Sequence, residues 1–118
     1  MINKEQFKFE AIKKSLNINE DAFAALLNIF KLETPQEIEN LKVAFSEKNT
    51  KLVNQIAHKL KTRFKILELE NPLKICLELE SVTLKESENI TNCNKLQSLE
   101  SQVNNAIQQI DLYIKNLN

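Results

Sequence analysis

The chain of 118 residues contains no glycine and two prolines, Pro35 and Pro72. Glycine normally makes up about 7% of a protein and supplies the positive φ angles that tight β-hairpin turns require. A chain without glycine therefore favours helices joined by short connections over hairpins and sheets. Short connections also place neighbouring helices antiparallel. We expect an all-α protein.

Apolar residues recur at helical spacing along most of the sequence and predict six helical segments. The segments cover residues 4–16, 20–32, 35–47, 50–69, 72–87 and 92–117. Together they predict an antiparallel four-helix bundle with an additional short N-terminal helix. The length is that of one domain, so we expect a single domain over residues 1–118 with its bundle core at about 20–117.

Helix-capping residues set most of the predicted boundaries. Asn19 is a good N-cap for the segment that follows it. Thr34, Pro35 and Glu37 match a capping box, which predicts a helix over 35–47 bent from the preceding one. The "NP" dipeptide at 71 and 72 is expected to cap and begin the fifth segment in the same way.

The apolar faces of these helices are assigned to the core. Residues assigned to packing include Phe7, Phe30, Val43, Phe45, Leu52 and Tyr113. Cys76 and Cys93 are too few to staple a domain of this size, and neither lies in a metal-ligand pattern. We expect both to be reduced thiols in or near the core.

The charge balance excludes a global electrostatic function. Sixteen basic and sixteen acidic residues give zero net charge, so we expect no nucleic-acid or membrane partner. No apolar run approaches the roughly 18 residues of a membrane span, and "MINKEQFKFE" does not resemble a leader peptide. We expect a cytoplasmic monomer.

The single histidine lies in "AHKLKTRFK" (57–65), where four basic residues and no acid accompany it. At 100° per residue His58 points roughly 165° away from the apolar stripe of the 50–69 helix, which predicts an exposed ring. Lys51, Gln55, Lys61, Thr62 and Lys65 share its face. The three lysines of this face would attract a phosphoryl group or a carboxylate, although a lysine-rich helix face is also often merely solvated.

Other kinds of site lack their components. A chain with one histidine, no acid three or four residues from it and no glycine offers neither a zinc site nor a phosphate-binding loop. We expect no metal site and no autonomous kinase or phosphatase site.

The residues around His58 resemble the histidine-containing phosphotransfer (HPt) domain of bacterial multistep phosphorelays. That family typically reads A-H-x-L-K-G-S, has a glycine ten residues after the histidine, and continues into an apolar helix ending C-x-x-L-E. The matching positions are Ala57, His58, Leu60, Lys61, Cys76, Leu79 and Glu80. The resemblance extends over about residues 20–115.

The resemblance implies a phosphorelay carrier rather than an enzyme. His58 would accept a phosphoryl group from the aspartate of a receiver domain and pass it to another receiver, with Lys61 stabilising the phosphoryl oxygens. The docking residues implied are Lys51, Gln55, Lys59, Thr62 and Lys65. The partners would be response-regulator receivers and a hybrid histidine kinase, with Mg²⁺ on the receiver and no cofactor of the carrier's own.

Two positions depart from the family pattern, because Thr62 and Glu68 stand where the family has glycines. The Thr62 side chain shares the face of His58 and could hinder a partner or contribute a hydroxyl to the phosphoryl group. Two alternatives therefore stay open: an HPt-like module that binds receivers without transferring phosphate, and a helical adaptor of unrelated function.

Overall fold

The computed structural model describes residues 8–80 and 89–117, with side chains from residue 94 onward in the second range. Its helices are α1 (Phe9–Leu16), α2 (Glu20–Ser46), α3 (Thr50–Ile66), α4 (Glu70–Glu80) and α5 (Asn89–Asn116). The described ranges contain no strand, and the predicted all-α class is confirmed.

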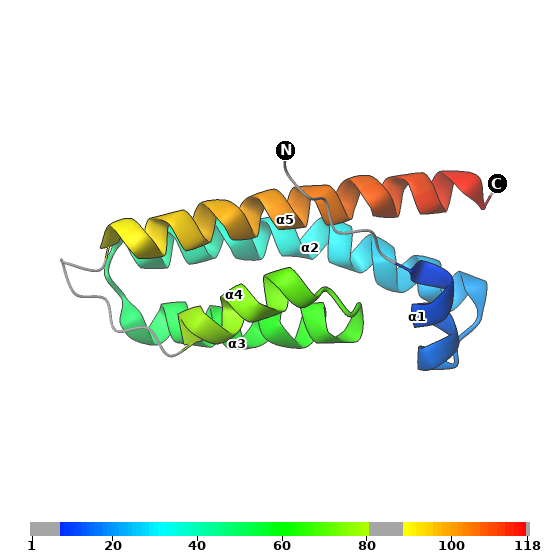
Figure 1. Ribbon diagram of the computed structural model, residues 1–118, viewed down its shortest axis with the longest axis horizontal. Coiled ribbons are helices and arrows are strands. Elements are labelled where there is room, and N and C mark those ends of the chain that lie inside the picture. The colour runs from blue at the N-terminus through cyan, green and yellow to red at the C-terminus, as the bar shows by residue number, and fades with distance from the viewer. Residues whose placement is uncertain (1–7, 81–88, 118) are drawn as a thin grey trace.

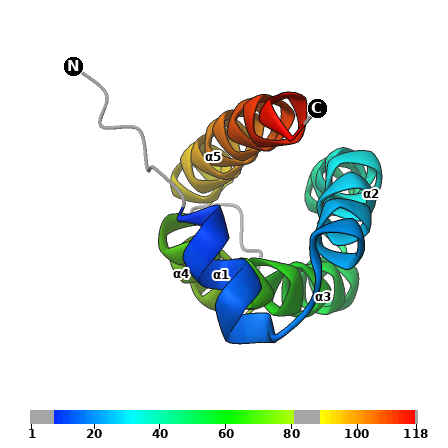
Figure 2. The same ribbon diagram turned by 90° about the vertical axis from the view of Figure 1, so that its right-hand side faces the viewer.

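The four helices α2 to α5 lie along the long axis of the molecule, whereas α1 packs at one end (Figure 1). The end-on view shows a ring in the order α2, α3, α4, α5, with α1 crossing one end of it (Figure 2). Each helix of the ring contacts two neighbours. The predicted four-helix bundle with an extra N-terminal helix is therefore confirmed.

The predicted break at Thr34 and Pro35 is wrong, because α2 continues through both residues. Its buried positions follow one helical stripe on either side of the proline, including Phe30 and Ile38. Packing of this stripe holds the helix together, although Pro35 cannot donate the usual backbone hydrogen bond. The Thr34 hydroxyl does not act as a cap: it is buried without a hydrogen-bond partner among the described residues.

The predicted start of α4 is also wrong by two residues. The helix begins at Glu70, so Asn71 and Pro72 are its second and third residues. The Leu73 N–H donates to the Leu69 carbonyl at 3.0 Å. Pro72 is tolerated here because the first N–H groups of a helix have no intrahelical acceptor. By contrast, the Asn19 cap of α2 is confirmed, since its Oδ1 accepts from the Ala22 N–H at 2.8 Å.

Non-glycine residues form the left-handed ends of three helices. Asn17, Lys48 and Glu68 each have φ of 55° after α1, α2 and α3. At the end of α3, the Leu69 N–H donates to the Phe64 carbonyl at 2.9 Å, which closes the chain reversal that glycine ordinarily makes. A side chain costs about 1 to 2 kcal/mol in this conformation, less for asparagine, so Lys48 and Glu68 are strained.

The core runs the length of the ring and contains most of the residues assigned to it. Phe30 packs against Phe64 across α2 and α3, with ring centroids 6.0 Å apart. Cys76 is a buried free thiol, as expected. Burial raises its pKa to about 12, with a smaller contribution from Glu80, so it is a poor nucleophile near neutral pH.

Two residues assigned to packing are instead exposed. Val43 is 55% exposed and Leu52 is 37% exposed. Leu52 lies at the edge of the buried stripe of α3, whereas Val43 lies on the face of α2 that points away from its buried residues. Phe7 and the Cys93 side chain lie outside the described residues.

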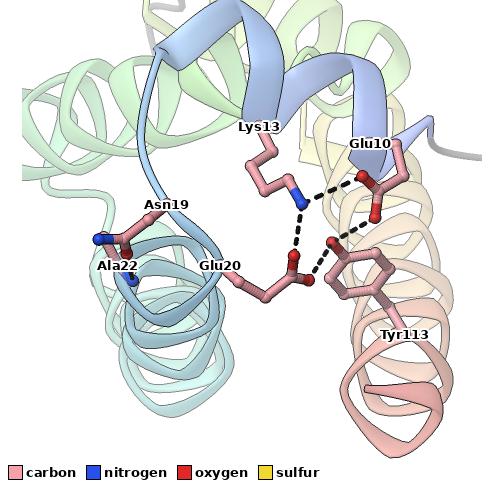
Figure 3. Close-up of polar contacts among 6 residues, drawn as sticks. All are labelled: Glu10, Lys13, Asn19, Glu20, Ala22 and Tyr113. Carbon is pink, nitrogen blue, oxygen red and sulfur yellow. Dashed lines mark hydrogen bonds and ion pairs between the residues drawn. The ribbon is translucent and has the colours of Figure 1, made fainter.

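A polar cluster fastens α1 to the end of the bundle (Figure 3). The Tyr113 hydroxyl of α5 lies 2.9 Å from Glu10 of α1 and 3.0 Å from Glu20 of α2, and Lys13 binds both carboxylates. Burial and the two carboxylates raise the pKa of Tyr113, so the hydroxyl stays a donor. The Phe9 ring packs beneath, 5.1 Å from that of Tyr113.

Candidate functional site

His58 lies near the middle of α3, where the helix presents its solvent face. Asn49 caps the helix, with its Oδ1 accepting from the Leu52 N–H at 3.1 Å. The buried residues of α3 are Val53, Ile56, Ala57, Leu60 and Phe64. These point into the ring of helices and turn the His58 side chain outward, leaving it 64% exposed. The predicted exposure of His58 is confirmed.

A carboxylate from the neighbouring helix α4 holds one nitrogen of this ring. Oε1 of Glu80 lies 2.6 Å from Nδ1 of His58. A carboxylate only accepts hydrogen bonds, so the proton of a neutral ring lies on Nδ1 and the lone pair on Nε2. Among the described residues Nε2 has no hydrogen-bond partner. The contact thus leaves the outer nitrogen free to act as a nucleophile.

The same carboxylate binds Lys61, one turn after the histidine. Nζ of Lys61 lies 2.9 Å from Oε2 of Glu80 and 3.2 Å from its Oε1. The Lys61 hydrogen bond, followed by that from His58, lowers the pKa of Glu80, against partial burial that acts to raise it. Glu80 is therefore an anion that both residues share.

Acids from α2 line the other flank of α3. Nζ of Lys59 lies 3.3 Å from Glu37, and a guanidinium nitrogen of Arg63 lies 2.9 Å from Glu33. Three cations of the basic run that looks uncompensated in the sequence, Lys59, Lys61 and Arg63, are therefore paired with carboxylates from the two neighbouring helices. Lys59 belongs to this flank and is not brought together with the remaining predicted docking residues.

The other predicted docking residues lie on the same side of α3 as the histidine. Lys51, Gln55, Thr62 and Lys65 are all exposed, and we call them, with His58, the His58 face. Within the described part of the chain, Lys51 and Lys65 have no ion-pair partner. Their contact with a partner stays a prediction.

An apolar hollow lies between α2 and α3, beyond the Arg63–Glu33 pair. Its lining residues are Leu26, Ile29, Phe30, Glu33, Arg63, Ile66 and Leu67. Ile66 follows His58 by eight residues, or about 12 Å along the helix axis. Because Glu33 and Arg63 line it, the hollow adjoins the α2 flank of α3.

The described residues contain no cluster of three or more histidine, cysteine or acidic side chains that could hold a metal ion. No helix in the described ranges has the length and apolarity to cross a membrane. The expectation that this chain carries no cofactor of its own stays a prediction.

Reasoning from the residues alone missed Glu80 as a site residue. It lies 22 positions after His58 on a different helix, so periodicity within α3 could not place it. The available signal was its position in the C-x-x-L-E pattern, four residues after the buried Cys76. The contacts that Asn54, one turn before His58, makes with α4 were likewise not predicted.

Comparison with known families gives one finding. The family model described as "Hpt domain" matches residues 25–113, which include α3, α4 and most of α2 and α5. No curated protein and no solved structure matches the chain.

Proposed function

The chain belongs to the Hpt domain family, and we propose that it is a phosphorelay carrier that takes a phosphoryl group from one receiver domain and gives it to another. The observation that carries the proposal is the exposed ring of His58, whose Nδ1 is held by Glu80. This arrangement presents a single, oriented nucleophile at the surface, where a second protein can reach it.

The proposed transfer requires little from the carrier itself. The lone pair on Nε2 attacks the phosphorus of a receiver's aspartyl phosphate, the N–P bond forms, and the P–O bond breaks to release the aspartate as a carboxylate. The ring then carries a positive charge and keeps its Nδ1 proton. The Glu80 carboxylate, 2.6 Å away, stabilises that cation. Reversal of the step on a second receiver discharges the carrier.

Lys61 is proposed to bind the phosphoryl oxygens. Its ammonium group is held by Glu80 one helical turn from His58, within reach of a group attached to the same face. When the phosphoryl group arrives, Lys61 can shift from the carboxylate to the new anion while Glu80 keeps the ring proton. A positive charge supplied where negative charge accumulates favours the transfer.

The receiver is proposed to dock on the His58 face, with Lys59 at its margin. The unpaired cations Lys51 and Lys65 suit the acidic, Mg²⁺-binding end of a receiver. The metal would belong to the receiver, and the kinase and the second receiver would use the same face in turn. The expected monomeric state, the cytoplasmic location and the absence of an autonomous kinase or phosphatase activity belong to this proposal.

One observation favours a second candidate, a module that binds receivers without transferring phosphate. The exposed Thr62 lies one turn from His58 on the surface that a receiver must approach. A side chain there can keep the phosphorus from reaching Nε2 while leaving the surrounding contacts intact.

Transfer from labelled receivers separates the two candidates. Candidate receivers carrying ³²P on their aspartate are mixed with the wild-type chain and with His58→Gln, and acid-labile label on the chain is measured beside receiver binding. A carrier takes label only in the wild type. Binding by both proteins with label on neither identifies the non-transferring module, and label retained by His58→Gln overturns the assignment of His58. The substitution is exposed and should change the free energy of unfolding by less than about 0.5 kcal/mol.

A further inference from the structure

Asn54 connects α3 to the two residues with which the described part of α4 ends. In the amide orientation that satisfies both of its polar atoms, Nδ2 of Asn54 lies 3.0 Å from the carbonyl oxygens of both Leu79 and Glu80. The side chain is half-buried and one turn before His58 on α3. One amide thus binds the backbone of the residue whose carboxylate holds the histidine.

The two contacts of Glu80 with α3 are therefore made by different parts of the residue. Its backbone carbonyl accepts from Asn54, and its carboxylate binds His58 and Lys61. The helices α3 and α4 also pack against each other, and Ala57, Cys76 and Leu79 are fully buried in the core that they share. Packing is non-directional, so it sets the rotation and register of Glu80 less sharply than two hydrogen bonds do.

We infer that Asn54 is a positioning residue that places the Glu80 carboxylate on Nδ1 of His58. Its amide anchors the Glu80 backbone to the helix that bears the histidine. The ring tautomer, and through it the free lone pair on Nε2, then depends on a residue whose amide hydrogen-bonds to the Glu80 backbone and not to the ring. The consequence for phosphoryl transfer rests on the proposed function, whereas the consequence for the tautomer does not.

The test measures the ring directly in the unphosphorylated protein. The ¹⁵N chemical shifts of Nδ1 and Nε2 are recorded at a pH where the His58 ring is neutral. The proteins compared are the wild type, Asn54→Leu, Glu80→Gln and the double variant. Leucine is similar in size to asparagine and has a higher helix propensity, but it cannot donate a hydrogen bond. We expect Asn54→Leu to move both shifts from the Nδ1–H tautomer toward the other, to a value between wild type and Glu80→Gln. The double variant should match Glu80→Gln, because Asn54 acts through Glu80.

Val53→Ala serves as the matched control. Val53 is the preceding residue on α3 and is fully buried, so its truncation loosens the bundle without touching the amide. It should lower stability and leave both nitrogen shifts in place. Asn54→Ala, which removes the amide without adding a charge, should shift the ring in the same direction as Asn54→Leu and provides the readout if the leucine variant does not fold.

Wild-type nitrogen shifts in folded Asn54→Leu or Asn54→Ala would overturn the inference. It would also be overturned if Val53→Ala moved the shifts equally, because the effect would then be a general loss of packing. A failure of the proposed function looks different: the wild type takes no label from any receiver while the Asn54 variants still change the tautomer. In a working carrier, the transfer rate of Asn54→Leu should fall between those of wild type and Glu80→Gln.

Discussion

Nζ of Lys61 lies 2.9 Å from Oε2 of Glu80. The cation proposed to stabilise the phosphoryl group therefore already has an anionic partner in the unphosphorylated protein. The pair keeps a long, flexible side chain close to His58 before any partner arrives, and a group positioned in advance loses less entropy during the reaction. The same pair also means that Lys61 gives up part of one contact when it binds the phosphoryl group.

Lys61→Ala is expected to slow transfer without weakening receiver binding to the same degree. A hydrogen bond to a charged group contributes about 1.5 to 3 kcal/mol, so the transfer rate at saturating receiver should fall roughly tenfold to a hundredfold. Rapid-quench measurements with a phosphorylated receiver give the rate. Lys115→Ala, an exposed lysine at the far end of α5, is the control for loss of one positive charge. Equal rates for wild type and Lys61→Ala would mean that the receiver supplies all the charge stabilisation.

Thr62→Gly should change transfer and stability in opposite directions. Removing the side chain opens the approach to His58 and should raise the transfer rate, while the added backbone freedom in α3 costs roughly 0.5 kcal/mol of stability. Rapid-quench transfer assays measure the rate, and urea unfolding measures the stability. A slower rate at saturating receiver would show that the hydroxyl contributes to the site, and an unchanged rate would make Thr62 a neutral replacement.

Glu68→Gly should stabilise the protein. The left-handed conformation at φ of 55° costs a residue with a side chain about 1 to 2 kcal/mol, and glycine removes this cost. The greater conformational freedom of glycine in the unfolded chain opposes this stabilisation by about 0.4 to 1 kcal/mol. We expect a net increase of about 0.5 to 1 kcal/mol in the free energy of unfolding by urea. Glu47→Gly, at a right-handed position with φ of −83°, is the matched control and should destabilise. A loss of stability in both variants would contradict the strain assigned to Glu68.

The Glu80 contacts should make stability depend on pH in the acid range. Lys61 and His58 hold the pKa of Glu80 below its ordinary value of 4.5. A carboxyl whose pKa is lower in the folded state stabilises the fold fully above its unfolded pKa, and that stabilisation is lost as the pH falls through the folded pKa. Urea midpoints of wild type and Glu80→Gln should therefore differ by a constant amount at neutral pH and converge below about pH 4.5. A difference that widens on acidification would rule out this coupling.

The sequence predicted the helices and their faces more reliably than their ends. Apolar spacing within α3 correctly placed Leu60 in the core and His58 in solvent. The capping pattern at Thr34 and Pro35 failed because local signals do not report the packing stripe that continues through them. Leu52 was misassigned for a related reason: a one-helix pattern shows which residues could be buried but not how far a neighbour covers them. Val43 was misassigned because helical spacing, applied strictly, places it on the opposite face of α2 from Leu41 and Phe45.

The site was predicted in part. The position of His58 and Lys61 on one face followed from helical geometry. Their shared contact with Glu80 depends on how α4 packs against α3, and no spacing within either helix determines that. The same limit applies to the acids of α2 that bind Lys59 and Arg63, because a local run of basic residues does not show which acids of other helices pair with it.

The cluster that fastens α1 to the bundle has a practical consequence for how this domain is excised. The family match begins at residue 25, but the ring of Tyr113 lies 5.1 Å from that of Phe9 and 5.7 Å from that of Phe23. A fragment cut to residues 25–113 would lose both rings and the Glu10 and Glu20 acceptors of the tyrosine hydroxyl. It would present a fresh apolar end to solvent, and such ends promote self-association. Expression boundaries for this domain should therefore start before Phe9.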